Sequence, residues 1–125
     1  MASRKRPPTV RQLLGTLNKV RVRCINKFKT DPSQTGEWRP DETDSDLEGI
    51  IVIATKIDAK RGVDGLLTYA LHELVHAYFQ VNCNDNRAHH DKIYRWESLL
   101  FRSRALREAM AIRVGNAYIY GQEEP

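Results

Sequence analysis

One segment stands out in the sequence: Leu71-His72-Glu73-Leu74-Val75-His76-Ala77-Tyr78. It lies within a longer run, residues 64–81, that is apolar at nearly every helical position. A helix that is apolar on almost all sides belongs in the middle of a domain and not on its surface. We therefore expect a central helix from about Asp64 to Val81, with Asp64 as its N-cap.

The polar residues of this segment have the spacing of a metal site. His72 and His76 are four residues apart, so both imidazoles project from one face of a helix and can bind the same Zn²⁺ at about 2.0–2.1 Å each. Glu73 points along the same side without binding the ion, so its carboxylate can take a proton from a water molecule. Burying these three side chains in an apolar helix would be costly without a partner, which a metal ion supplies. The spacing predicts one zinc ion held by His72 and His76, with Glu73 as the catalytic base.

A catalytic zinc site has three protein ligands and keeps one position open. The only other histidines of the chain are His89 and His90, 13 and 14 residues after His76. That interval is long enough for the chain to leave the helix, turn and come back. On spacing alone, either histidine can be the third ligand, and the other lies near the site or on the surface. If both bound the ion, the site would be closed and catalysis would be excluded.

Apolar spacing predicts two further helices. An amphipathic helix is expected from about Val10 to Phe28, with Thr9 as its N-cap. A third helix should begin near His90 or Asp91 and continue, after a break near Ser103, through Ile112.

The segments outside these helices carry other patterns. Residues 31–46 are rich in turn-forming and acidic residues and are interpreted as loops. Residues 47–54 are rich in β-branched side chains and predict a strand, with an extended piece or short strand at 55–59. The tail, 115–125, is expected to form a final strand or a packed extension.

Length and composition fit one globular domain. The chain has 125 residues, of which 41% are hydrophobic and 29% charged. It has no apolar run of about 18 residues, so we expect no membrane span. Residues 1–8 are basic without an apolar stretch behind them, unlike a secretory signal. We expect them to be a disordered tail on a single domain, 9–125, that is a monomer inside the cell, in the nucleus or the cytoplasm. Cys24 and Cys83 form no Cys-x-x-Cys pair and are interpreted as buried thiols, although a disulfide between them stays open.

The charge is unevenly distributed along the chain. Residues 1–30 hold nine Lys or Arg and no acid, whereas the rest carries eleven basic and sixteen acidic residues, a net charge of −5. A basic arm on an acidic body suggests a polyanionic partner. Lys19, Arg23 and Lys27 would form one stripe on the first helix and are our candidates for contacting DNA. The alternative is that these charges only keep a surface helix solvated.

Residues 71–78 resemble the active-site helix of the SprT-like metallopeptidases, the family that includes Spartan. In that family a second motif follows, Gly-His-Gly-x-x-aromatic, whose histidine is the third ligand. The similar stretch here is His89-His90-Asp91-Lys92-Ile93-Tyr94. The resemblance places His90 at the ligand position and Tyr94 at the aromatic position, although both family glycines are replaced.

The resemblance covers about residues 47–101. It implies an α+β, zincin-like metallopeptidase domain: a central active-site helix with a small sheet, here shortened to roughly one strand, and flanking helices. It also implies hydrolysis of peptide bonds in protein substrates bound or crosslinked to DNA.

Two other functions stay open at this stage. One is a zincin peptidase outside DNA repair. The other is a non-catalytic module that binds zinc for structure and recognises DNA or protein. Glu73 argues against the second, because a purely structural site uses four protein ligands and needs no base.

Overall fold

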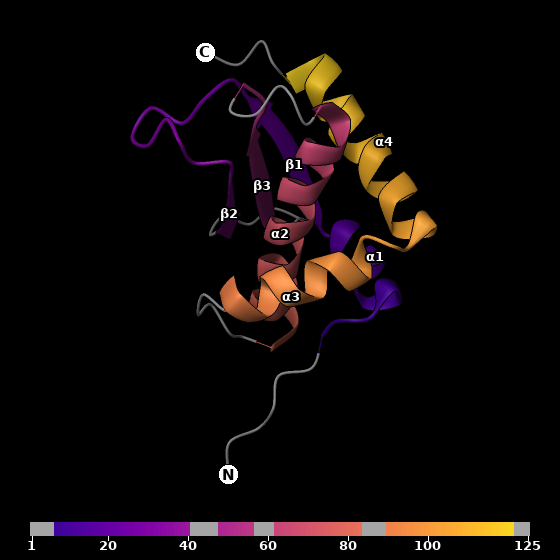
Figure 1. Ribbon diagram of the computed structural model, residues 1–125. Helices are drawn as coiled ribbons and strands as arrows, with labels where there is room; N and C mark the ends of the chain where they lie inside the picture. The colour runs from indigo at the N-terminus through magenta and orange to yellow at the C-terminus, as the bar shows by residue number, and fades with distance from the viewer. Residues whose placement is uncertain (1–6, 41–47, 57–61, 84–89, 122–125) are drawn as a thin grey trace.

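The computed structural model describes residues 7–40, 48–56, 62–83 and 90–121, which form helices and strands in the order shown in Figure 1. The elements are α1 (Val10–Leu17), β1 (Val20–Ile25), β2 (Gly36–Pro40), β3 (Gly49–Ala54), α2 (Gly62–Cys83), α3 (His90–Leu100) and α4 (Arg104–Gly121).

The three described strands form one mixed sheet in the order β1-β3-β2. β1 runs parallel to β3, with Val22 beside Ile51, and β2 runs antiparallel to it, with Trp38 beside Ile51. The central strand is β3, whose Ile51, Val52 and Ile53 are almost fully buried. Helices and a small sheet together confirm the α+β class.

Helix α2 occupies the middle of the molecule, as its apolar sequence predicted. Leu71, Leu74, Val75 and Ala77 have no exposed surface, and they join a core to which α1, α3, α4 and the sheet all contribute. Helix α2 lies along β2 and β3, while α4 packs against β1. The predicted bounds of 64–81 are short by two residues at each end.

The predicted first helix is wrong in its second half. Thr9 caps α1 with a capping box, as expected, but α1 ends at Leu17 and β1 follows. Val20, Val22 and Cys24 alternate with Arg21 and Arg23, which is the period of a strand. Positions four apart fit a strand as well as a helix, so Val20 and Cys24 did not discriminate between the two.

This correction removes the predicted helical stripe of cations. Lys19 lies in the turn after α1, Arg23 lies within β1, and Lys27 follows the end of β1. A basic N-terminal helix carrying these three side chains does not exist.

Other expectations are corrected in the same way. The segment 31–46 contains β2, because Trp38 and its neighbours pair with the apolar β3. The sheet in the described residues therefore has three strands, whereas we expected the strands of the family to be shortened here to roughly one. The break near Ser103 is confirmed, since its Oγ accepts a hydrogen bond from the Leu106 N–H at 3.2 Å at the start of a separate helix. The tail from Gly115 to Gly121 is helical and not a strand.

Several predictions fall partly or wholly outside the described residues. Of the segment 55–59, only Thr55 and Lys56 are described, and they form a bend. The expected tail, 1–8, is described only at Pro7 and Pro8.

Cys24 is a free, fully buried thiol, as predicted. Burial raises its pKa to about 11, and its Sγ lies 3.9 Å from the carbonyl oxygen of Val114 in α4. The side chain of Cys83 falls outside the described residues.

None of the helices in the described part of the chain is long and apolar enough to cross a membrane.

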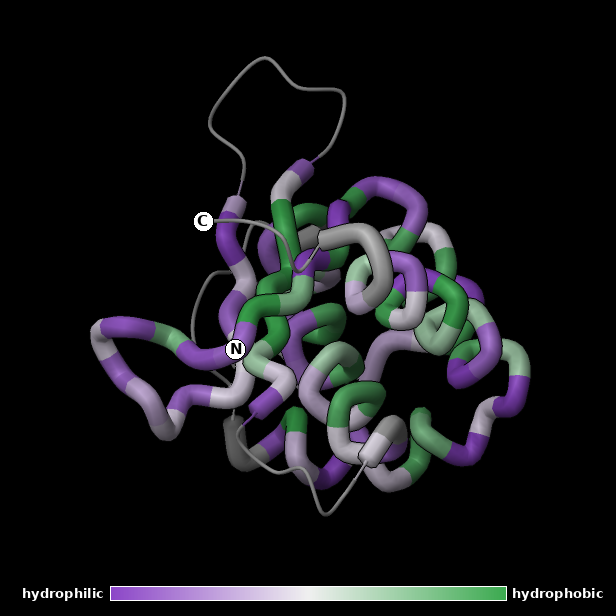
Figure 2. Tube along the Cα trace, turned by 90° about the horizontal axis from the view of Figure 1, so that it is seen from above, coloured by the Kyte–Doolittle hydropathy of each residue, from purple (hydrophilic) through white to green (hydrophobic). Residues whose placement is uncertain are grey.

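The sheet face away from α2 has a different character. Phe28, Val52 and Ala54 form a small apolar cluster there, with Ile25 and Ile50 packed against it. The loop between β1 and β2, which carries Phe28, projects from the body and is hydrophilic along most of its length (Figure 2). None of the residues in this cluster comes from a described helix.

Gly49 fixes how β2 meets β3. A Cβ at position 49 would collide with the carbonyl oxygen of Arg39 and with the ring of Trp38, whereas one at Gly15, on the surface of α1, would meet nothing. We expect Gly49→Ala to lower the free energy of unfolding by about 1–3 kcal/mol through overpacking. Gly15→Ala, the matched control, should raise it by about 0.5–1 kcal/mol. Urea unfolding measures both, and equal effects of the two changes would contradict this packing.

Candidate functional site

One face of α2 is polar and lines a cavity of about 1000 Å³ between α2, β2 and α3. The polar face exists because residues three or four positions apart share one side of a helix, and the apolar residues between them face the core. The lining side chains from α2 are Thr68, Tyr69, His72, Glu73, His76 and Gln80.

His72 and His76 meet in this cavity. Their Nε2 atoms lie 3.2 Å apart, with the rings nearly edge-on at a centroid distance of 4.8 Å. Two nitrogens bonded to one tetrahedral zinc ion at about 2.0–2.1 Å are roughly 3.3 Å apart, so the observed spacing fits a shared metal ion. The predicted pair of ligands is therefore brought together.

Glu73 lies in the same cavity and is 8% exposed. Its pKa is raised to about 7, chiefly by burial. The charge of His72 and a hydrogen bond from the Trp38 backbone lower the pKa, whereas the charges of Glu37 and Glu97 contribute to the rise. A carboxyl group with a pKa near neutrality is suited to accept a proton.

Gly36 allows β2 to approach the Glu73 carboxylate. A Cβ at position 36 would lie 3.0 Å from Cγ and 3.1 Å from Oε2 of Glu73, so any larger residue would push the carboxylate aside. One turn beyond His76, Gln80 accepts a hydrogen bond of 2.6 Å from Nε1 of Trp38. This bond ties β2 to α2 and sets the width of the cavity beside the histidines.

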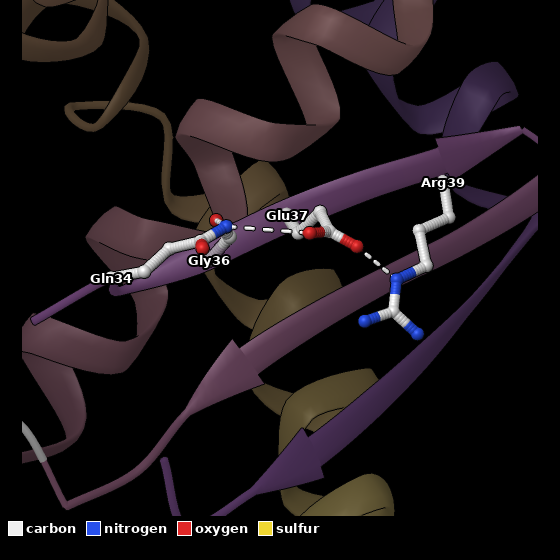
Figure 3. A network of polar contacts seen from close by, with 4 residues as sticks. All are labelled: Gln34, Gly36, Glu37 and Arg39. Atoms are coloured by element: carbon white, nitrogen blue, oxygen red, sulfur yellow. Dashed lines mark hydrogen bonds and ion pairs between the residues drawn. The ribbon is translucent and has the colours of Figure 1, made fainter. Parts of the chain in front are cut away.

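A polar network runs along β2 and joins Gln34, Gly36, Glu37 and Arg39 (Figure 3). The Glu37 carboxylate accepts hydrogen bonds from Nε of Arg39 and from Nε2 of Gln34, and Nε2 of Gln34 also donates to the carbonyl oxygen of Gly36 at 2.9 Å. The network joins Gln34 to the first residues of β2 and holds the Glu37 carboxylate, whose charge acts on Glu73.

Two residues of α3 complete the described lining, Tyr94 and Glu97. The Tyr94 ring lies 5.1 Å from the His72 ring, centroid to centroid, so the aromatic position named by the resemblance does lie at the site. The Glu97 Oε1 atom lies 2.6 Å from Nδ1 of His72. Glu97 was not among the residues predicted from the sequence. The available indication was its position, because it is the one acid within the apolar stripe of Ile93, Trp96 and Leu100.

The two predicted candidates for the third ligand are His89 and His90. His90 is the first residue of α3, but its side chain and the whole of His89 fall outside the described residues. Within the described residues, no group of three or more His, Cys, Asp or Glu side chains is arranged to hold a metal ion. In this described part of the chain, His72 and His76 therefore supply two nitrogens at a spacing that fits a metal ion.

The surroundings of the two imidazoles suit a cation. Glu73 and Glu97 bring two carboxyl groups close to them, and both are nearly buried. Buried carboxylates are costly unless a positive charge or hydrogen bonds compensate them. The donor set therefore fits a divalent metal.

No protein-family model, curated protein or solved structure matches this chain. The resemblance to the SprT-like metallopeptidases therefore stays a prediction, supported by the motif and by the geometry of its side chains.

Proposed function

We propose that this chain is a zinc-dependent metallopeptidase with a zincin-like, SprT-like domain. The observation that carries the proposal is the 3.2 Å separation of the His72 and His76 Nε2 atoms beside a buried glutamate on the same helix face. His90 is the proposed third ligand, with His89 as the alternative.

Each residue of the polar face has a chemical task in this proposal. When bound, zinc polarises the carbonyl of the scissile peptide and lowers the pKa of a water molecule toward about 7. His72 and His76 hold the ion through their Nε2 atoms. The Glu73 carboxylate removes a proton from the attacking water and delivers it to the leaving amine nitrogen as the C–N bond breaks. Its place under β2 keeps this carboxylate fixed and largely away from bulk water.

The cavity favours a protein substrate in an extended conformation. Among the described strands, β2 is an edge of the sheet, and it lines the cavity next to His76 and Glu73. An edge strand can pair with an extended peptide through main-chain hydrogen bonds. Such pairing reads the backbone more than the side chains, which supports a peptidase of broad sequence preference.

Glu73→Gln tests the proposal most simply. The amide has nearly the shape of the carboxylate but cannot act as a base, so we expect about one zinc per chain and a loss of casein hydrolysis by a factor of about 100 or more. His76→Ala is the control for the metal and should lose both zinc and activity. Metal content by mass spectrometry and cleavage of unfolded casein provide the readouts.

Two results would count against a peptidase. A Glu73→Gln variant as active as the parent would mean that Glu73 is not the base. A parent chain that holds zinc but cleaves no unfolded protein, alone or with DNA, would favour the non-catalytic zinc module.

The second proposed role is contact with a nucleic acid through the sheet face that carries Phe28, Val52 and Ala54. A cavity of about 460 Å³ on this face is lined by four cations, Arg23, Lys27, Lys29 and Arg39, and by one carboxylate, Glu37. The cations come together because Arg23 and Arg39 lie on strands that flank β3, and the segment after β1 adds the two lysines. This excess of positive charge, and not the helical stripe predicted from the sequence, is what favours a phosphate backbone as ligand.

The paired charge reversals Lys27→Glu, Lys29→Glu should weaken DNA binding and lower the slope of log affinity against log salt by about 2 for duplex DNA. The matched control is Arg11→Glu, Lys19→Glu, because it changes the net charge by the same amount. Its two positions are exposed and lie elsewhere, in α1 and in the turn before β1. Fluorescence anisotropy over a range of salt measures both. An equal loss of DNA affinity in the two variants would show that only net charge matters. No loss of affinity in either variant would exclude this face as the DNA-binding surface.

A further inference from the structure

Glu97 is a nearly buried acid whose task the proposed reaction does not explain. It is 9% exposed and lies on the face of α3 that also carries Ile93, Trp96 and Leu100, all of them buried. A carboxylate in such surroundings is unfavourable unless it is hydrogen-bonded. The structure provides a bond to His72, with 2.6 Å between Oε1 and Nδ1.

This bond determines which nitrogen of His72 carries the proton. A carboxylate in its ionised form can only accept hydrogen bonds, and with Glu97 in that form Nδ1 of His72 is the donor. In a neutral imidazole the other nitrogen is then an acceptor with a free lone pair. That nitrogen, Nε2, is the atom that lies 3.2 Å from Nε2 of His76.

The geometry also indicates that Glu97 is not itself a metal ligand. Its Oε1 atom meets Nδ1 of His72, whereas the His76 imidazole meets Nε2. The two contacts are at different nitrogens of one ring, so Glu97 orients the ring from behind. Helix α3 packs directly against α2. The position of α3 therefore determines where the Glu97 carboxylate meets the His72 imidazole.

We propose that Glu97 is a positioning residue that holds His72 as the Nδ1–H tautomer and so presents Nε2 to a divalent metal ion. The proposal rests on the proposed zinc site. Carboxylates that accept from the second nitrogen of a metal-binding histidine typically strengthen metal binding by about 10–100-fold.

The test compares Glu97→Ala and Glu97→Gln with the parent and with Glu108→Ala. Glu108 is the control, because it is also a helical glutamate with one partner, Arg104 at 2.8 Å, but it lies exposed on α4. In metal-free protein, at a pH where imidazoles are neutral, ¹⁵N NMR of the ring nitrogens reports the tautomer of His72. Competition with a chromogenic chelator gives the zinc dissociation constant.

We expect the parent to carry its proton on Nδ1 of His72. Glu97→Ala should lose this preference and raise the zinc dissociation constant by about 10–100-fold. Glu97→Gln keeps an acceptor oxygen and should fall between Ala and the parent in both readouts. Glu108→Ala should match the parent.

A proton on Nε2 of His72 in the metal-free parent would overturn the proposal. So would an unchanged tautomer and an unchanged zinc affinity in both Glu97 variants. If Glu97→Ala fails to fold, the comparison of Glu97→Gln with the parent still tests the proposal. The amide has nearly the size of the carboxylate, so this variant should keep the packing of α3. The tautomer is read without metal or substrate, so a parent chain without hydrolytic activity would contradict the peptidase and not the role of Glu97.

Discussion

Because α2 is apolar on nearly every side, the rest of the chain has to surround it, and its one polar face becomes the wall of a cavity. The sheet covers one side of the helix, and α1, α3 and α4 pack around the others. His72, Glu73 and His76 share the face that remains. A surface helix with the same motif would expose these side chains to water, where a carboxylate keeps its ordinary pKa and imidazoles move freely.

The elements around α2 restrict the polar residues one by one. β2 approaches closely enough to hold Glu73 because position 36 is a glycine, and the bond from Trp38 to Gln80 keeps that strand in place. α3 brings Glu97 to the far nitrogen of His72. The result is a pair of imidazole nitrogens at the spacing of a shared metal ion, set among carboxyl groups. A divalent cation bound there would compensate part of the negative charge of Glu73 and Glu97.

The sequence predicted the parts of this arrangement that follow from the helical spacing of residues within one segment. The helical spacing of apolar residues located α2, and the i, i+4 histidines located the site. The segment 20–25 was misassigned because Val20 and Cys24 fit both a helix and a strand, and only the pairing of β1 with β3 settles the choice. β2 was missed because its five residues gain their stability from β3 and not from local preference. Contacts between distant segments, such as Glu97 with His72, follow from packing and have no local pattern.

The measurement that tests this account most directly is the anomalous scattering of crystals grown with one equivalent of zinc. Data recorded on both sides of the zinc absorption edge locate the ion without reference to any assumed ligand. We expect one peak at about 2.0–2.1 Å from Nε2 of both His72 and His76, with the Glu73 carboxylate near the ion but not bonded to it. A peak bound to other residues, or no peak between these two nitrogens, would contradict the assignment of α2 as a metal-binding helix.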